Sequence, residues 1–314
     1  MTEFSIDPWD PGYAAALTSE ALAERGSTSA ELELGVEAEA GDWAPVTPSG
    51  SAPAALLVAD GVRRIDARVW VHDTPVPVPG IAASFAAGIV RCGSGGAELA
   101  EIEVRRALIS ASPGTPEVKT RYATFHPAQA TDSSLEALTL ALQRQVTQLE
   151  LELSVRHRRQ STDLLLVDGP LRGRGHLAGT VGYIKTHHIS YLPAPQSAVV
   201  GALAPGQRTP VFLMGTTWRR HAWYVRLPTT SSAPWSGIAR CEAGADMSSE
   251  EVVRLADAIT LALPPLAGVP YKDPRAPQNL VPIGGLEKLL RHHLGDPQLM
   301  YRALRSAESV QGSR

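Results

Sequence analysis

The sequence predicts an α/β protein in which a mixed sheet is flanked by helices. Strand-like apolar runs occur at residues 55–60 and 164–167, and each ends in Asp-Gly. Between them, residues 133–153 carry leucines and valine at spacings of three and four, which predicts an amphipathic helix. Further strand-like and helix-like segments continue to residue 305, so we expect additional C-terminal strands and helices.

The expected elements follow one another in a simple order. Residues 1–53 are expected to form a short helix and then a polar arm or linker, and residues 54–314 the main domain. The long helix should open at Ser133, which forms a capping box with Glu136. The other expected segments are a helix at 13–25, strands at 55–60, 63–72 and 81–92, looser segments at 100–109 and 117–125, strands at 164–167, 211–213 and 224–227, and helices at 248–263 and 286–305.

Composition places few limits on function. The chain has 314 residues, 44% of them hydrophobic, and a net charge of −3, which is too small to indicate a charged partner. Cys92 and Cys241 are the two cysteines and show no zinc-ligand spacing, so we expect a reduced, cytoplasmic protein. The sequence contains neither a long apolar run nor a basic-then-apolar leader, so neither membrane insertion nor export is expected.

The two Asp-Gly pairs allow two interpretations. Asp-Gly is a common hairpin turn, and for Asp60 the alternating residues 64–72 fit a returning strand. Asp168 is instead followed by the basic, Gly-rich loop 170–175, which weakens the hairpin explanation there. If the two strands lie side by side, their carboxylates meet, and such a cluster needs Mg²⁺ or Mn²⁺ to neutralise it. Either Glu150 or Glu152 of the long helix fits as the third carboxylate.

The order of three strands, a helix and a further strand is that of the ribonuclease-H-like fold. Within that order the sequence resembles the NurA nucleases, which act with the HerA ATPase in DNA end processing. The resemblance is carried by residues 57–61, 148–152, 163–171 and 181–192. It implies a homodimer that uses Mn²⁺ or Mg²⁺ to cut DNA, and it assigns Asp60, Glu150 and Asp168 as metal ligands. Lys185 is a further candidate for the catalytic site.

The chain departs from the NurA pattern at two places. Gly61 is followed by Val62 where the family usually has serine. The family also places a histidine near its C-terminal end, and here the corresponding stretch supplies Asp273 and Asn279. The fourth ligand therefore stays open between these two residues and a histidine such as His292 or His293.

Basic and aromatic residues fit a nucleic-acid substrate. Phosphates of a bound strand need cationic donors, and the candidates are Arg64, Arg172, Arg174 and Arg275. Bases of single-stranded DNA could stack on aromatic side chains, although packing in a core or dimer interface is the favoured interpretation of this group. The group comprises Trp218, Trp223, Tyr224 and Trp235.

Two functions remain open from the sequence. The first is a metal-dependent deoxyribonuclease, a 5′-to-3′ exonuclease and single-strand endonuclease, that works with a HerA-type hexameric ATPase in repair or defence. The second is a catalytically inactive adaptor that docks on an ATPase ring. The carboxylate set favours the nuclease, because an adaptor has no physical reason to hold such charges together.

Overall fold

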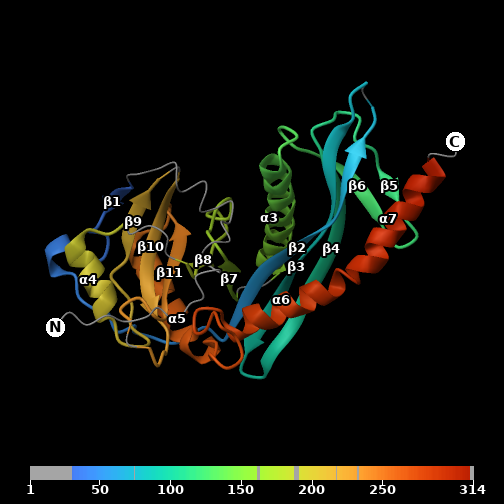
Figure 1. Ribbon diagram of the computed structural model, residues 1–314. Coiled ribbons are helices and arrows are strands. Elements are labelled where there is room, and N and C mark those ends of the chain that lie inside the picture. Colours follow the sequence, from blue (N-terminus) through green and yellow to red (C-terminus); the bar gives the residue numbers. More distant parts are fainter. Residues whose placement is uncertain are drawn as a thin grey trace, which may run out of the picture. The chain divides into compact units, whose positions relative to one another are not determined.

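The computed structural model (Figure 1) describes residues 30–73, 75–160, 163–186, 191–216, 218–231 and 233–311. The helix expected at 13–25 lies outside the described residues. Eleven strands form one sheet with the order β1-β9-β10-β11-β8-β7-β2-β3-β4-β6-β5. The strands are β1 (Glu31–Glu33), β2 (Ala55–Val71), β3 (Val78–Gly93), β4 (Gly96–Ser110), β5 (Val118–Lys119), β6 (Thr124–Gln129), β7 (Leu164–Asp168), β8 (Thr180–Ile184), β9 (Phe212–Gly215), β10 (Arg219–Arg226) and β11 (Ile238–Gly244).

The strand order confirms the ribonuclease-H-like arrangement. β2, β3 and β4 follow one another in the chain and are neighbours in the sheet, α3 comes next, and β7 then lies beside β2. β7 pairs in parallel with β8. The helices are α3 (Leu135–Gln160), α4 (Ala194–Ala202), α5 (Ser249–Ala262), α6 (Val281–His293) and α7 (Pro297–Gln311), with 3₁₀ turns at Ala40–Asp42 and Pro264–Leu266.

The expected hairpin at Asp60-Gly61 is wrong. Residues 55–60 and 63–72 were expected to be two strands, but β2 is a single strand of 17 residues that runs through both. The third strand of the meander is therefore β4, where the sequence showed only a loose segment at 100–109. The alternating pattern after Gly61 continues β2 instead of returning along it.

The long helix begins one residue later than expected. Ser134, and not Ser133, supplies the cap, because its Oγ accepts a hydrogen bond from the Ala137 amide at 3.1 Å. The Ser134 amide in turn donates to Asp132 Oδ1 at 2.8 Å. By contrast, the capping box of Ser248 with Glu251 at the start of α5 is present as the sequence indicates.

The chain divides into two compact units. The first holds residues up to 58 together with 91–98 and 157–284, and the second holds 59–90, 99–156 and the residues from 285. In the first unit, Phe212, Ala222 and Tyr224 share a buried core with Val200 of α4. Residues 30–53, expected to be an arm or linker, contribute Trp43 to this core, and β1 pairs with β9.

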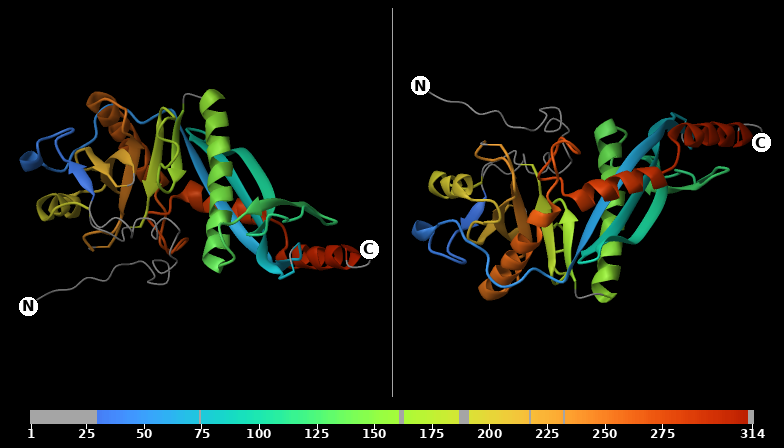
Figure 2. Two further views of the ribbon diagram at one scale, coloured as in Figure 1. Left: turned by 90° about the horizontal axis from the view of Figure 1, so that it is seen from above. Right: turned by 90° about the horizontal axis from the view of Figure 1, so that it is seen from below.

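In the second unit, helices cover both faces of the long strands (Figure 2). α3 packs on β2 at Gly61, where Val146 and Glu150 approach the strand. α6 packs on β3 at Gly88, which Leu286 and Leu290 approach. Met300 and Leu304 of α7 join a buried cluster with Ala82, Leu108 and Phe125. No helix among the described residues is both long and apolar enough to cross a membrane.

Candidate metal centre

Glu150 approaches β2 at Gly61, the residue after Asp60. Asp60 lies on β2 and is 7% exposed, and Glu150 lies on α3 and is 9% exposed. A β-carbon built on Gly61 would lie 2.3 Å from Glu150 Oε1 and 2.7 Å from Val146 Cγ1. Only glycine therefore lets the Glu150 carboxylate lie against β2 at this position. This close approach, and not a turn, explains the glycine after the first aspartate.

Glu152, the alternative to Glu150, has a different role. Its carboxylate pairs with Arg105 at 2.6 Å and accepts a hydrogen bond from Gln148 at 3.0 Å. These hydrogen bonds, chiefly the one from Arg105, lower the pKa of Glu152. The helix thus directs Glu150 toward β2 at Gly61 and Glu152 toward an ion pair with β4.

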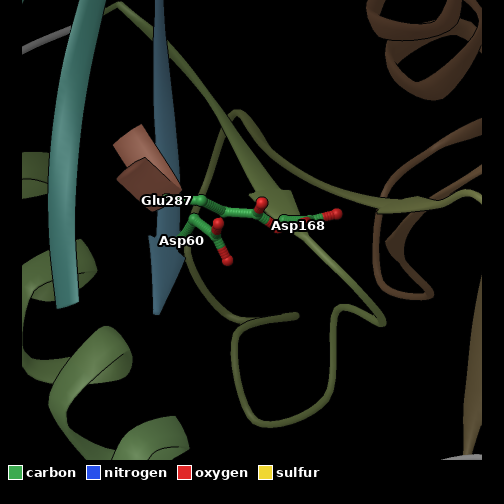
Figure 3. A group of neighbouring side chains, drawn as sticks. All are labelled: Asp60, Asp168 and Glu287. Carbon is green, nitrogen blue, oxygen red and sulfur yellow. The ribbon is translucent and has the colours of Figure 1, made fainter. Parts of the chain in front are cut away.

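Glu287 is an acidic neighbour of Asp60 that the sequence analysis missed. It lies on α6, and one of its carboxylate oxygens lies within 4.8 Å of a carboxylate oxygen of Asp60. Figure 3 shows the side chains of Asp60 and Glu287. A signal was present in the sequence, because Glu287 follows the buried Ile283 by four residues and precedes the buried Leu290 by three. That spacing places it beside the covered face of the helix.

Asp168 belongs to the first unit and ends β7. Its Oδ2 accepts a hydrogen bond from Lys185 Nζ at 2.6 Å, and the two side chains are 12% and 15% exposed. Lys185 directly follows β8, so the parallel pairing of β7 and β8 brings both residues to the same edge of the sheet. Lys185 Nζ also donates to Asn279 Oδ1 at 3.0 Å.

Two of the fourth-ligand candidates, Asn279 and Asp273, are hydrogen-bonded to each other, and Asn279 is also bonded to Lys185. Asn279 Nδ2 donates to Asp273 Oδ2 at 2.6 Å, and Arg275 pairs with the same carboxylate at 3.2 Å. Burial acts to raise the pKa of Asp273, but the hydrogen bonds from Arg275 and Asn279 outweigh it and lower that pKa. The alternatives His292 and His293 are exposed residues at the end of α6.

The predicted DNA-binding arginines are placed differently from one another. Arg64 pairs with Asp66 at 2.7 Å and donates to the carbonyls of Gly295 and Leu294, which follow α6. Arg275 is engaged by Asp273. Arg174 is only 3% exposed, and Arg172 is half-buried in the Gly-rich loop. Arg64 and Arg275 thus each have partners within the protein, and these partners account for the positions of the two side chains.

The aromatic group separates into core residues and one pocket residue. Trp223 and Tyr224 are 0% and 1% exposed, and Trp235 packs edge-on against Tyr224 with ring centroids 5.7 Å apart. Packing, the favoured interpretation, is therefore confirmed for these three side chains. Trp218 instead lines an open pocket.

Comparison with known proteins gives matches in structure alone. The sequence matches no family model and none of the curated proteins. The structure is similar to the crystal structure of the NurA nuclease from Sulfolobus solfataricus, with a TM-score of 0.45 and 12% identity over 80% of this chain and 87% of that one. It is also similar to the catalytic domain of human Endonuclease V, with a TM-score of 0.37 and 18% identity over 78% of this chain and 83% of that one.

Proposed function

We propose that this protein is a metal-dependent deoxyribonuclease in which Asp60, Asp168 and Glu287 hold one or two divalent cations. The observation that carries the proposal is the pair of carboxylates on β2 and α6, whose oxygens lie within 4.8 Å of one another. Two carboxylates this close repel each other unless a cation or a proton neutralises them. Oxygen ligands of this kind select Mg²⁺ or Mn²⁺.

Chain continuity supports the assignment of Asp168 to the same centre. The part of β2 that includes Val58 belongs to the same unit as β7, its neighbour in the sheet. Asp60 follows Val58 by only two residues along an unbroken strand. α6 likewise begins in that unit, and Glu287 follows Gly284 by three residues within the helix. Asp60 and Glu287 therefore each follow closely, in sequence, residues that belong to the unit of Asp168.

Glu150 is a further candidate ligand in this proposal. It lies against Gly61, next to Asp60, and can serve as a ligand or accept a hydrogen bond from a metal-bound water. A cation held by such a set supplies Lewis-acid stabilisation of the attacking and leaving oxygens of a phosphodiester. The Lys185 ammonium, which pairs with Asp168, would then hold a non-bridging phosphate oxygen.

The adaptor is the competing function. An adaptor would need the fold and an external surface, but it has no use for a pair of acidic side chains held close together at Asp60 and Glu287. Cleavage polarity, the choice of Mn²⁺ over Mg²⁺, a homodimeric state and a HerA-type translocase are further parts of our proposal, and the sequence resemblance is what supports them.

The test is Asp168→Asn, which keeps the shape of the side chain but removes the charge. DNA cleavage should fall by about 10²-fold or more, measured on end-labelled single- and double-stranded DNA with Mn²⁺ or Mg²⁺. Asp163→Asn is the matched control, because Asp163 lies just before the same strand, where it pairs with Arg91 at 2.7 Å.

Metal binding provides a second measurement that does not depend on activity. Mn²⁺ should raise the melting temperature of the wild type and of Asp163→Asn, because a ligand of the folded state stabilises it. The rise should shrink in Asp168→Asn and in Glu287→Gln. Near-normal cleavage by Asp168→Asn would show that this aspartate is structural, and a wild type that neither cleaves DNA nor responds to metal would favour the adaptor.

A further inference from the structure

An open pocket lies on the first unit beside the loop that follows Asp168. It has a volume of about 480 Å³, within the range of small-molecule sites. Its lining includes Gly173, Gly175 and His176 of that loop together with Trp218 and Arg219. The remaining lining residues are Leu213, Gly244, Ala245 and Asp246.

Gly173 and Gly175 bring no side chains into the pocket. A β-carbon on Gly173 would meet nothing within 4 Å, and one on Gly175 would meet only the Gly244 α-carbon at 3.8 Å. Gly173 also has a φ of +71°, which disfavours other residues there. Gly244 is in direct contact with this loop, because a β-carbon there would lie 2.4 Å from the Gly175 carbonyl oxygen. The loop therefore presents flat backbone to the pocket.

Trp218 is held in place by Arg220, which is 1% exposed. Its guanidinium carbon lies 4.6 Å from the centroid of the Trp218 ring, and its Nη1 donates to the Trp218 carbonyl at 3.2 Å. Arg220 is itself held by the fully buried Glu242 at 2.7 Å. The indole is thus positioned before any ligand binds.

The same glutamate also holds the start of the glycine-rich loop. Glu242 Oε2 accepts a hydrogen bond from the Leu171 amide at 3.2 Å, three residues after Asp168. One buried carboxylate therefore ties the loop that begins at Asp168 to the residue that positions Trp218. The pocket is a built feature, and its geometry is linked through the chain to the end of β7.

We propose that this pocket binds one nucleobase of a single-stranded DNA substrate, stacked on Trp218. The proposal rests on the nuclease function above and adds the place of a base. An aromatic ring and glycine backbone in one lining suit a planar ring, and stacking accepts any base. Arg219 and Asp246 bring opposite charges to the lining, which favours a neutral base over a phosphate group.

The experiment measures DNA binding with EDTA present, so that no cleavage occurs. A short fluorescein-labelled single strand is compared with a series in which one base at a time is replaced by an abasic sugar. For the wild type, removal of one particular base should weaken binding roughly five- to hundredfold, the usual range for a base stacked on an aromatic side chain. Trp218→Ala should lose the same factor on the intact strand and become insensitive to that abasic position, and Trp218→Phe should retain part of the effect.

Two further variants keep the test independent of folding. Trp70→Ala removes a tryptophan that is 64% exposed on β2 and should leave all affinities unchanged. Gly175→Val adds a side chain to the lining, where the β-carbon has room, and should weaken binding with little change in melting temperature.

The outcomes separate this proposal from the nuclease function. A wild type that binds the strand while Trp218→Ala binds it equally well, or keeps the same abasic sensitivity, overturns the pocket alone. A wild type that binds no single strand in EDTA also overturns the pocket proposal, whereas the nuclease function is decided separately by the cleavage and metal-binding measurements above.

Discussion

Gly61 determines how close α3 comes to β2. Glu150 Oε1 and Val146 Cγ1 occupy the space that a side chain at Gly61 would take. An interior glycine weakens a strand, but here it lets a carboxylate contact the residue that follows Asp60. Gly88 does the same for Leu286 and Leu290 of α6, but there the incoming groups are apolar. The polar approach is the unusual one, and it occurs at the residue that follows Asp60.

Gly61→Ala should therefore be harmful, although alanine normally fits a strand better than glycine. The new methyl group would displace Glu150 and press on Val146, and overpacking of this kind costs about 1–3 kcal/mol. We expect a lower free energy of unfolding in urea together with a smaller Mn²⁺-induced rise in melting temperature. Gly41→Ala, where a β-carbon meets nothing within 4 Å, is the control and should be close to neutral.

An unchanged metal response in a destabilised Gly61→Ala variant would be informative. It would mean that Glu150 can move away without consequence for the cation. Glu150 would then be a packing residue, and Glu287 would be the acidic partner of Asp60 that matters.

At the level of elements, the sequence predicted the types of α3 and α5 but not every boundary. Hydrophobic spacing identified α3, because Leu138, Leu142, Leu149 and Leu153 are all buried on one face. The pattern Ser133-x-x-Glu136 resembled a capping box, but the adjacent Ser134 forms the cap because Asp132 accepts its amide hydrogen bond. Two neighbouring serines cannot be distinguished by pattern alone.

Ser134→Ala should destabilise the protein by about 1 kcal/mol, since it leaves the Ala137 amide without its cap. Ser133→Ala serves as the control and should change the unfolding free energy by no more than a few tenths of that amount. Chemical denaturation of both variants provides the measurement. Equal effects of the two substitutions would contradict the assignment of the cap to Ser134.

β2 shows why the hairpin could not be excluded in advance. Alternating side chains after Gly61 fit a returning strand and a continuing strand equally well, because both have a period of two. What distinguishes them is the approach of Glu150 from a helix some ninety residues later, which is a tertiary contact. Glu287 escaped notice for a related reason, because its neighbours on the sheet are unknown until α6 is placed.

For the whole molecule, the ribonuclease-H-like strand order was predictable, whereas the division into units was not. Order follows from the succession of strand, helix and strand, which is local information. The incorporation of residues 30–53 depends instead on Trp43 reaching a core formed by Phe212 and Tyr224, far along the chain. A polar segment with one tryptophan gives little local sign of such a contact.

Continuous digestion of duplex DNA is the part of the proposed function that depends on assembly. Hydrolysis of a phosphodiester does not pull DNA, so continuous digestion of a duplex requires a motor to feed the strand. We expect a homodimer of twice 33.4 kDa in light scattering at micromolar concentration, and faster duplex digestion when a HerA-type ATPase and ATP are added. A non-hydrolysable ATP analogue is the control, because docking without translocation should not accelerate digestion. A monomer whose rate on duplex DNA does not respond to the ATPase would leave the metal chemistry intact but remove the motor, and the protein would then act as a distributive nuclease.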